Sequence, residues 1–165
     1  NKFVSEALEK KSSLIIVNQI NKNYPLSKQV KVKNTLDFLT KCSSIFRENI
    51  NAKIISITGS CGKTTLKEMV GFTLKKISRT SYSPKSFNNK YGVPWSLFNL
   101  KQKDDFGVFE VGMDKKGEID NLTKITKPDL GIITNISYAH SKNFESINQI
   151  AEAKAEIMNN IKIYK

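Results

Sequence analysis

Cysteine is almost absent from this chain, which contains only Cys42 and Cys61 among its 165 residues. Two isolated cysteines are too few for a disulfide framework or for a zinc site with paired ligand spacing. The sequence therefore predicts a protein of a reducing compartment, and we expect it in the cytoplasm.

Long apolar runs are absent as well. The longest are residues 14–17 and 130–133, far short of the roughly 20 apolar residues that a membrane-spanning helix requires. We therefore expect no membrane span. The chain begins without Met and without a secretory signal pattern, so we interpret it as an internal piece of a longer protein.

Arginine and acidic residues are scarce relative to lysine. The sum of 27 Lys and Arg against 15 Asp and Glu gives a formal net charge of +12, and only Arg47 and Arg79 are arginines. Nucleic-acid recognition commonly uses the Arg fork, whereas the lysines here are spread along the whole chain. We therefore expect no nucleic-acid partner. A basic surface equally suits nucleotides and other phosphorylated small substrates.

What the chain does contain, from residue 53 onward, is an alternation of short apolar runs with helical stretches. The runs predict strands at 54–58, 106–111 and 130–134, and the stretches predict helices at 64–76, 94–100, 118–126 and 147–161. This order indicates an α/β fold with a doubly wound, mostly parallel sheet covered by helices on both faces. Residues 161–165 predict the start of a further strand.

The first 52 residues have a different pattern. Apolar spacing predicts a helix over 3–10, and strands are expected at 14–17 and 30–32. Asn34 and Thr35 suit the cap of a helix that ends near residue 49, which we expect to link two units.

The strongest motif lies where the apolar residues 54–58 run into a glycine-rich turn and then a predicted helix. Backbone N–H groups in such a turn bind phosphate, Lys63 adds charge for the β- and γ-phosphates, and Thr64 offers a hydroxyl to Mg²⁺. The match is to a short form, Gly59-x-x-Gly62-Lys63-Thr64, because Ile57 stands where the usual pattern has its first glycine. A structural turn is the alternative, but the flanking strand and helix favour a nucleotide site. The expected nucleotide-binding residues of this turn are Gly59, Ser60, Cys61, Gly62, Lys63, Thr64 and Thr65.

Other candidate residues are weaker from position alone. Glu110 and His140 each lie near the carboxyl end of a predicted strand, where open α/β sheets bind ligands, and a carboxylate there suits Mg²⁺. A solvated charge and a surface or capping histidine are the respective alternatives. Lys154, by its helical position, reads as a solvated residue, and Asn88 and Asn89 read as turn residues.

Five segments together resemble the Mur ligase family, and within it the ligases that add D-alanyl-D-alanine in peptidoglycan synthesis. They are T-G-S-C-G-K-T-T-L-K-E-M at 58–69, F-N-N-K-Y-G-V-P at 87–94, E-V-G-M with G-E-I in 110–119, T-N-I-S-Y-A-H with Phe144, and I-A-E-A-K-A-E-I at 150–157. Residues 3–17 also resemble the end of the family's UDP-sugar-binding domain. Small departures occur at Ser137, Tyr138 and Ala155.

The resemblance implies an ATP-dependent amide ligase. In that chemistry, the γ-phosphoryl group of ATP passes to the terminal carboxylate of a UDP-N-acetylmuramoyl tripeptide, and the amine of D-alanyl-D-alanine then displaces phosphate from the acyl phosphate. The resemblance makes Lys63, Glu110, His140 and Lys154 catalytic, with Asn88 and Asn89 at the nucleotide. It also implies two Mg²⁺ ions held by Thr64, Glu110, His140 and a carbamylated Lys154.

The resemblance also implies a domain organisation. Residues 1–33 correspond to the C-terminal part of the N-terminal domain, 34–51 to a linker helix and 52–165 to the first half of the ATP-binding central domain, with the C-terminal domain absent. We expect this piece alone to be inactive and the enzyme to be a monomer. The alternatives are another Mur or folylpolyglutamate-type ligase, a stand-alone ATP-binding P-loop module and a Lys-rich nucleic-acid-associated protein.

Overall fold

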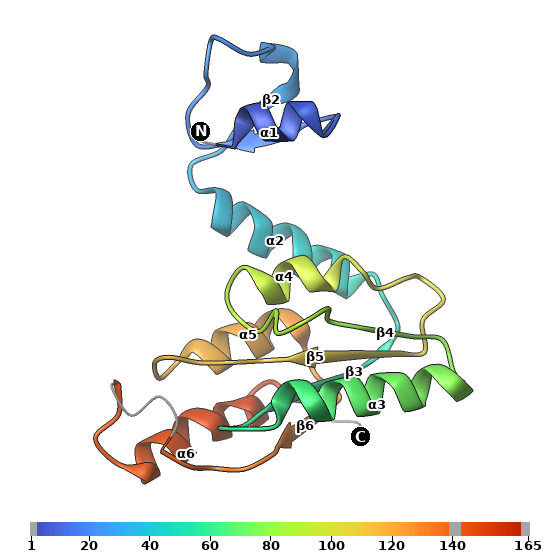
Figure 1. Ribbon diagram of the computed structural model, residues 1–165, viewed down its shortest axis with the longest axis vertical. Coiled ribbons are helices and arrows are strands. Elements are labelled where there is room, and N and C mark those ends of the chain that lie inside the picture. The colour runs from blue at the N-terminus through green and yellow to red at the C-terminus, as the bar shows by residue number, and fades with distance from the viewer. Residues whose placement is uncertain (1–2, 139–142, 163–165) are drawn as a thin grey trace. The chain divides into compact units, whose positions relative to one another are not determined.

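The computed structural model describes residues 3–138 and 143–162, and the chain divides into two compact units, Asn1–Lys41 and Cys42–Lys165 (Figure 1). The first unit contains α1 (Val4–Glu9), β1 (Ile15–Val17), the 3-10 turn η1 (Leu26–Lys28) and β2 (Gln29–Lys31). β1 and β2 pair in parallel, with Ile15 opposite Gln29. The predicted helix and both predicted strands of this unit are present.

Helix α2 (Thr35–Glu48) spans the division between the units. Its start follows from local sequence, because Asn34 Oδ1 accepts hydrogen bonds from the backbone N–H groups of Leu36 (2.9 Å) and Asp37 (3.3 Å). A side-chain oxygen at this position satisfies N–H groups that have no partner inside the helix.

The second unit is an α/β domain whose four parallel strands are ordered β4-β5-β3-β6. Its strands are β3 (Lys53–Thr58), β4 (Thr80–Tyr82), β5 (Phe106–Glu110) and β6 (Leu130–Ile133). Its helices are α3 (Lys63–Ile77), α4 (Gly92–Leu97), α5 (Glu118–Thr126), α6 (Ile147–Ala155) and the 3-10 turn η3 (Glu156–Met158). The predicted parallel α/β architecture is confirmed.

Two elements differ from the sequence prediction. Strand β4 was not predicted, because three residues are too short to show a period, and it exists through its pairing with β5, where Thr80 lies opposite Phe106. The helix predicted over 147–161 ends at Ala155 and passes into η3. There Glu156 accepts hydrogen bonds from the N–H groups of Gly117 (2.7 Å) and Asp120 (3.2 Å), which ties η3 to the start of α5. Ile161 and Lys162 are not in a strand, and residues 163–165 lie outside the described part.

Helices cover both faces of the sheet. Ile54 of β3 and Phe109 of β5 form a buried cluster with Leu97 of α4 and Ile125 of α5. Side chains alternate along a strand, so Val108 and Glu110 project to the opposite face, where α3 packs on β4 and β5. The sheet is therefore doubly wound, as expected.

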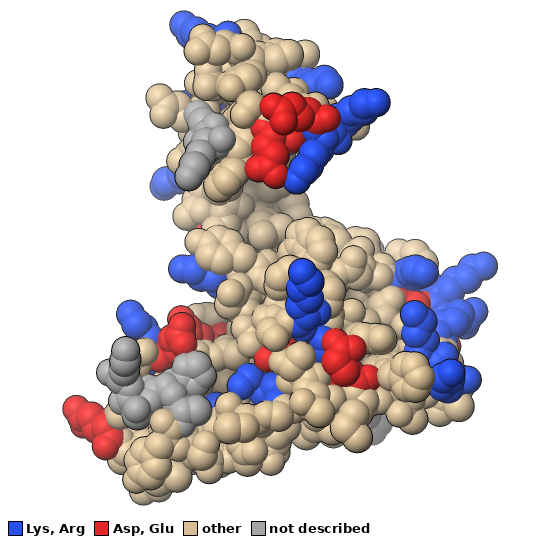
Figure 2. All heavy atoms as spheres, viewed as in Figure 1, with Lys and Arg blue, Asp and Glu red and all other residues tan. Residues whose placement is uncertain are grey.

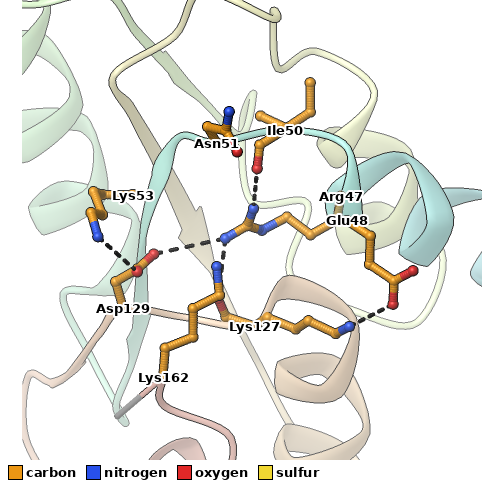
Figure 3. Close-up of a pocket in the computed structure, with 8 residues that line it drawn as sticks. All are labelled: Arg47, Glu48, Ile50, Asn51, Lys53, Lys127, Asp129 and Lys162. Carbon is orange, nitrogen blue, oxygen red and sulfur yellow. Dashed lines mark hydrogen bonds and ion pairs between the residues drawn. The ribbon is translucent and has the colours of Figure 1, made fainter. Parts of the chain in front are cut away.

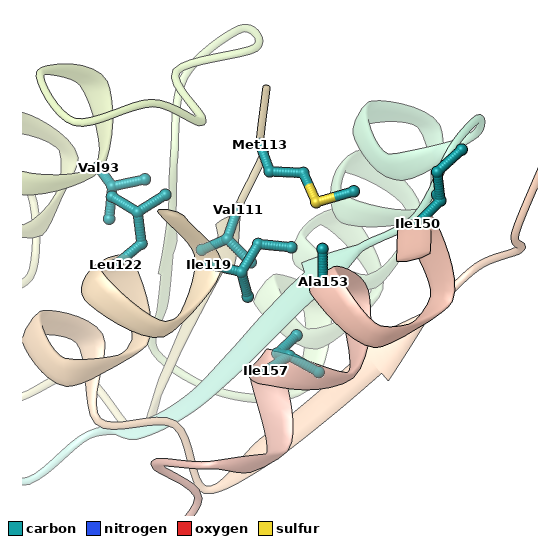
Figure 4. Packing of buried hydrophobic residues seen from close by; sticks show 8 residues of the cluster. All are labelled: Val93, Val111, Met113, Ile119, Leu122, Ile150, Ala153 and Ile157. Atoms are coloured by element: carbon teal, nitrogen blue, oxygen red, sulfur yellow. The ribbon is translucent and has the colours of Figure 1, made fainter. Parts of the chain in front are cut away.

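A second buried cluster joins α4, α5 and α6 near the end of β5 (Figure 4). Its members are Val93, Val111, Met113, Ile119, Leu122, Ile150, Ala153 and Ile157. Full burial of one such Val, Leu or Ile side chain contributes about 1.5–3 kcal/mol. The cluster fixes the position of α6, and with it that of Lys154.

The surface is mixed in charge. On the face shown in Figure 2, basic side chains are spread over the described residues with acidic ones between them, and some gather near the end of α3, whose last turn carries Lys75 and Lys76. None of the helices within residues 3–138 and 143–162 is long and apolar enough to cross a membrane.

Candidate functional site

The glycine-rich turn connects the end of β3 to the start of α3, as the sequence predicts. Gly59 has φ +144° and Gly62 has φ +77°, backbone conformations that favour glycine. Lys63 is the first residue of α3, and its Nζ folds back to donate to the carbonyl oxygens of Gly59 (2.7 Å) and Ser60 (3.3 Å). The first N–H groups of a helix have no helical acceptor, so this N-terminus can bind an anion.

The segment that follows β6 holds this turn in place. Ser60 N–H donates to the Asn135 carbonyl (3.0 Å), and Cys61 N–H donates to Asn135 Oδ1 (3.0 Å). Thr134 Oγ1 donates to the Cys61 carbonyl (2.6 Å). The Ser60 and Cys61 amides are thus used within the chain, which leaves the amides at the start of α3 for a phosphate.

Asn135 was not singled out from the sequence as a site residue. Two signals point to it: its place two residues after β6, at the same sheet edge as the turn, and its membership of the T-N-I-S-Y-A-H segment. The close approach also explains Gly59, because a Cβ at that position would lie 1.9 Å from Thr134 Oγ1.

Glu110 ends β5 and lies beside the turn, with 1% of its surface exposed. Its Oε2 accepts a hydrogen bond from Thr64 Oγ1 (2.7 Å), and its Oε1 accepts one from Asn88 Nδ2 (2.7 Å). Ser86 Oγ lies 3.2 Å from Thr64 Oγ1. The structure therefore brings together Thr64, Asn88 and Glu110, which are far apart in the sequence.

This cluster fits a magnesium–nucleotide complex in its donor chemistry. Mg²⁺ is usually bound by one or two carboxylates together with nucleotide phosphates, and here a hydroxyl and a carboxylate oxygen are neighbours at a phosphate-binding turn. Within residues 3–138 and 143–162 there is no group of three or more His, Cys, Asp and Glu side chains that could hold a metal ion.

The other predicted residues divide into three cases. Asn89 is not brought into the cluster, because its Oδ1 accepts the N–H groups of Tyr91 (3.0 Å) and Gly92 (3.0 Å) at the start of α4. Thr65 lies exposed in the first turn of α3. His140 lies outside the described residues.

Lys154 is buried, with 1% of its surface exposed, rather than solvated. Burial, and to a lesser degree the positive charge of Lys63, lower the pKa of its ammonium group to about 8 against an opposing contribution from Cys61. The electrostatic interaction with Lys63 and Cys61 means that α6 brings Lys154 towards the turn. The Lys154 amine is therefore partly neutral near pH 8, well below the pH at which an exposed lysine loses its proton.

A cavity of about 380 Å³ lies at the other edge of the sheet, where β3 and β6 begin (Figure 3). Two of the cations that line it, Arg47 and Lys127, are used for structure. Arg47 is buried, and its guanidinium donates to the carbonyls of Thr126 (2.8 Å) and Ile50 (2.7 Å). Lys127 pairs with Glu48 at 2.6 Å. We therefore assign the cavity no part in the phosphate chemistry.

A parallel sheet whose inner strand ends in a glycine-rich turn, with a hydroxyl and a carboxylate beside it, defines the P-loop class of nucleotide-binding domains. The family model described as Mur ligase middle domain matches residues 57–165. Within the P-loop class, the chain belongs to the Mur ligase family.

Named relatives agree with this assignment. The UDP-N-acetylmuramoyl-tripeptide–D-alanyl-D-alanine ligase of Buchnera aphidicola subsp. Acyrthosiphon pisum is 38% identical over 160 residues, which cover 97% of this chain and 35% of that protein. The enzyme of the same name from Rickettsia prowazekii is 37% identical over 158 residues, covering 96% of this chain and 35% of its own length.

Solved structures show the same likeness. MurF from Acinetobacter baumannii superimposes with a TM-score of 0.88 at 34% identity, covering 98% of this chain and 35% of that one. MurF from Thermotoga maritima in complex with ADP superimposes with a TM-score of 0.84 at 30% identity, covering 98% of this chain and 37% of that one. The present chain thus spans only about a third of the length of these relatives.

Proposed function

We propose that this chain is part of an ATP-dependent ligase that joins D-alanyl-D-alanine to a UDP-N-acetylmuramoyl tripeptide during peptidoglycan precursor synthesis in the cytoplasm. The observation that carries the proposal is the contact of Thr64 and Asn88 with Glu110 at the phosphate-binding turn. The names of the relatives in Buchnera and Rickettsia support the choice of substrates.

In this proposal the turn binds the phosphates of ATP. The N–H groups at the start of α3 meet the phosphate oxygens, and Lys63 moves its ammonium from the carbonyls of Gly59 and Ser60 to the β- and γ-phosphates. Thr64 and Glu110 would hold one Mg²⁺, and His140 together with a carbamylated Lys154 would hold a second. Bound Mg²⁺ neutralises charge on the transferring phosphoryl group. Asn88 orients the Glu110 carboxylate.

The reaction then needs no nucleophilic side chain. The substrate carboxylate oxygen attacks the γ-phosphorus, ADP leaves, and an acyl phosphate forms. The amine of D-alanyl-D-alanine attacks the acyl carbon, and phosphate leaves as the amide bond forms. The chain's contribution is to orient the reactants and to stabilise negative charge, which are large terms in phosphoryl transfer.

The domain assignment is part of the same proposal. Residues 1–33 would complete a UDP-sugar-binding domain, 34–51 would form a linker helix, and 52–165 would be the first half of the ATP-binding domain of a monomeric enzyme. The 165-residue chain alone is then expected to form no product.

The test is ADP formation by the full-length protein. We expect ADP release that requires both UDP-N-acetylmuramoyl tripeptide and D-alanyl-D-alanine, and loss of that release in Glu110→Gln. ATP hydrolysis that is independent of tripeptide would instead indicate a stand-alone P-loop module. Release that requires another amino acid would indicate a different Mur-type ligase.

Carbamylation of Lys154 has a separate test. Addition of CO₂ to the neutral amine increases the mass of the protein, so the intact mass of active enzyme kept in bicarbonate should show this adduct, and Lys154→Arg should not. Active enzyme with unmodified Lys154 would remove this part of the proposal.

A further inference from the structure

Lys67 lies outside the Gly59-x-x-Gly62-Lys63-Thr64 motif and has no part in the proposed chemistry, yet it has no exposed surface. Fully buried lysines are rare, because an ammonium group without partners is costly to remove from water. Lys67 Nζ donates to the carbonyl oxygens of Ser83 (2.6 Å) and Lys85 (2.8 Å), and it also pairs with Glu68. Its donors are therefore directed to the loop between β4 and α4.

Lys67 shares a helix face with a residue of the site. Thr64, Lys67 and Gly71 follow one another at spacings of three and four, which places them on one side of α3. All three contact β4 or the loop after it: Thr64 lies near Ser86, Lys67 bonds to Ser83 and Lys85, and an added Cβ at Gly71 would lie 2.6 Å from the Tyr82 ring.

The loop that Lys67 contacts carries two side chains of the cluster. Ser83 is joined to β5, since its N–H donates to the Val108 carbonyl (2.9 Å) and its Oγ accepts from Glu110 N–H (3.4 Å). Lys85 has φ +49°, a conformation that is unfavourable for a residue with a side chain and needs support from its surroundings. Ser86 and Asn88 follow directly and contact Thr64 and Glu110.

We propose that Lys67 is a positioning residue, whose ammonium group fixes the 83–86 turn on α3 and thereby holds Ser86 and Asn88 against Thr64 and Glu110. This inference rests on the proposed nucleotide chemistry of the site. Lys67 has no exposed surface, and its ammonium group is bonded to two carbonyl oxygens and to Glu68, so we place it outside the contacts with the nucleotide. It acts on the geometry of the Thr64–Glu110 pair, and so on the part of nucleotide affinity that depends on Mg²⁺.

The experiment measures binding of ADP to the full-length protein by calorimetry, with and without Mg²⁺. In Lys67→Met we expect the affinity for ADP without Mg²⁺ to stay within about twofold, because the phosphate-binding turn is intact. The increase in affinity that Mg²⁺ brings should fall by about 10- to 100-fold, the usual effect of losing a residue that orients a metal ligand. Lys75→Met, on the exposed last turn of the same helix, is the matched control and should match the wild type.

If Lys67→Met loses ADP affinity equally with and without Mg²⁺, Lys67 has a merely structural role. If ADP affinity is unchanged in both conditions, Lys67 has no role. Either result overturns the proposal. If Lys67→Met does not fold, Lys67→Gln is combined with Asn88→Ala. Each substitution should reduce the increase in ADP affinity that Mg²⁺ brings. The reduction in the double variant should be smaller than the sum of the two single reductions, because both residues act through Glu110. Additive reductions would overturn the proposal. Wild-type protein that binds no ADP would instead contradict the proposed function itself.

Discussion

Glu110 illustrates how the site depends on individual side chains. It is buried at the end of β5, and the donors on its two carboxylate oxygens come from residues 46 and 22 positions away, Thr64 and Asn88. Hydrogen bonds to both oxygens hold the buried carboxylate in one orientation. The site is therefore already arranged for a cation before any nucleotide arrives.

Lys63 is the residue whose loss should affect catalysis most directly. Lys63→Met removes the ammonium group that the proposal places on the phosphates, so kcat of the full-length ligase should fall by about 10²- to 10³-fold. Steady-state ADP release is the measurement, and Lys103→Met, at an exposed lysine, is the control. Activity within threefold of wild type would contradict the role of Lys63.

The pKa of Lys154 predicts a pH dependence. With the pKa lowered to about 8, NMR of ¹³Cε-labelled lysine should show a midpoint near pH 8 for the signal that Lys154→Arg removes. Between pH 8 and the usual lysine pKa of about 10.4, the unfolded chain binds more protons than the folded chain, so this group makes stability rise with pH in that window. A midpoint near 10.4 would show that Lys154 is solvated.

Among the secondary-structure elements, α3 has the most varied role. Its N-terminus is the proposed phosphate site, and one side, with Thr64, Lys67 and Gly71, fits against β4 and the loop after it. Strand β4 could not be predicted from three residues, and the contacts of Lys67 follow from its pairing with β5. The local sequence pattern predicted helix α3 but not that it packs on β4 and the loop after it.

The close packing at Gly71 predicts the direction in which a substitution there changes stability. Glycine to alanine inside a helix ordinarily stabilises by about 1 kcal/mol. Here the new Cβ would meet Tyr82 Cγ at 2.6 Å and Tyr82 Cβ at 3.1 Å, so rotating the ring does not free the space. Gly71→Ala should therefore lower the free energy of unfolding by about 1–3 kcal/mol, measured by urea titration of the full-length protein.

The same substitution made in a Tyr82→Ala protein tests whether the Tyr82 ring causes the destabilisation. In Tyr82→Ala the ring is gone and only the Cβ at 3.1 Å remains, so Gly71→Ala should destabilise much less than it does in the wild type. The same destabilisation in both backgrounds would mean that Tyr82 is not responsible.

Across the α/β domain as a whole, the two edges of the sheet have separate tasks. The carboxyl edge carries the phosphate-binding turn and Glu110. The amino edge contains Arg47, which bonds to carbonyls after α2 and at the end of α5 and lies 3.7 Å from Asp129 Oδ2 (Figure 3). Stability and chemistry can therefore be changed independently.

The chain's two arginines allow a matched comparison. Arg47→Met leaves the buried carbonyls of Thr126 and Ile50 without this donor and removes a buried cation from Asp129. It should cost about 3–5 kcal/mol of unfolding free energy. Arg79→Met removes an exposed pair with Asp105 and should cost no more than about 1 kcal/mol. Both variants should bind ADP as wild type does while folded. Similar losses of stability in the two would contradict the structural role of Arg47.

Local patterns in the sequence were enough for the glycine-rich turn, for strands β3, β5 and β6 with the helices between them, and for a parallel sheet. Each depends on neighbouring residues: apolar periodicity, glycines at φ +144° and +77°, and the helix that follows. The resemblance of their segments also predicted Glu110 and Asn88 as site residues, and the structure brings the two side chains into contact. Asn89, equally marked by sequence, instead accepts hydrogen bonds at the start of α4.

Contacts between distant segments were decided by the tertiary structure alone. Arg47 reaches a carbonyl 79 residues away, Cys61 N–H reaches Asn135 across 74, and Lys67 reaches the loop after β4 across 16. A lysine or arginine on a helix has the same local pattern whether it is solvated or buried. Only the packing of another element over it removes the water, and the carbonyl groups of that element then become its partners.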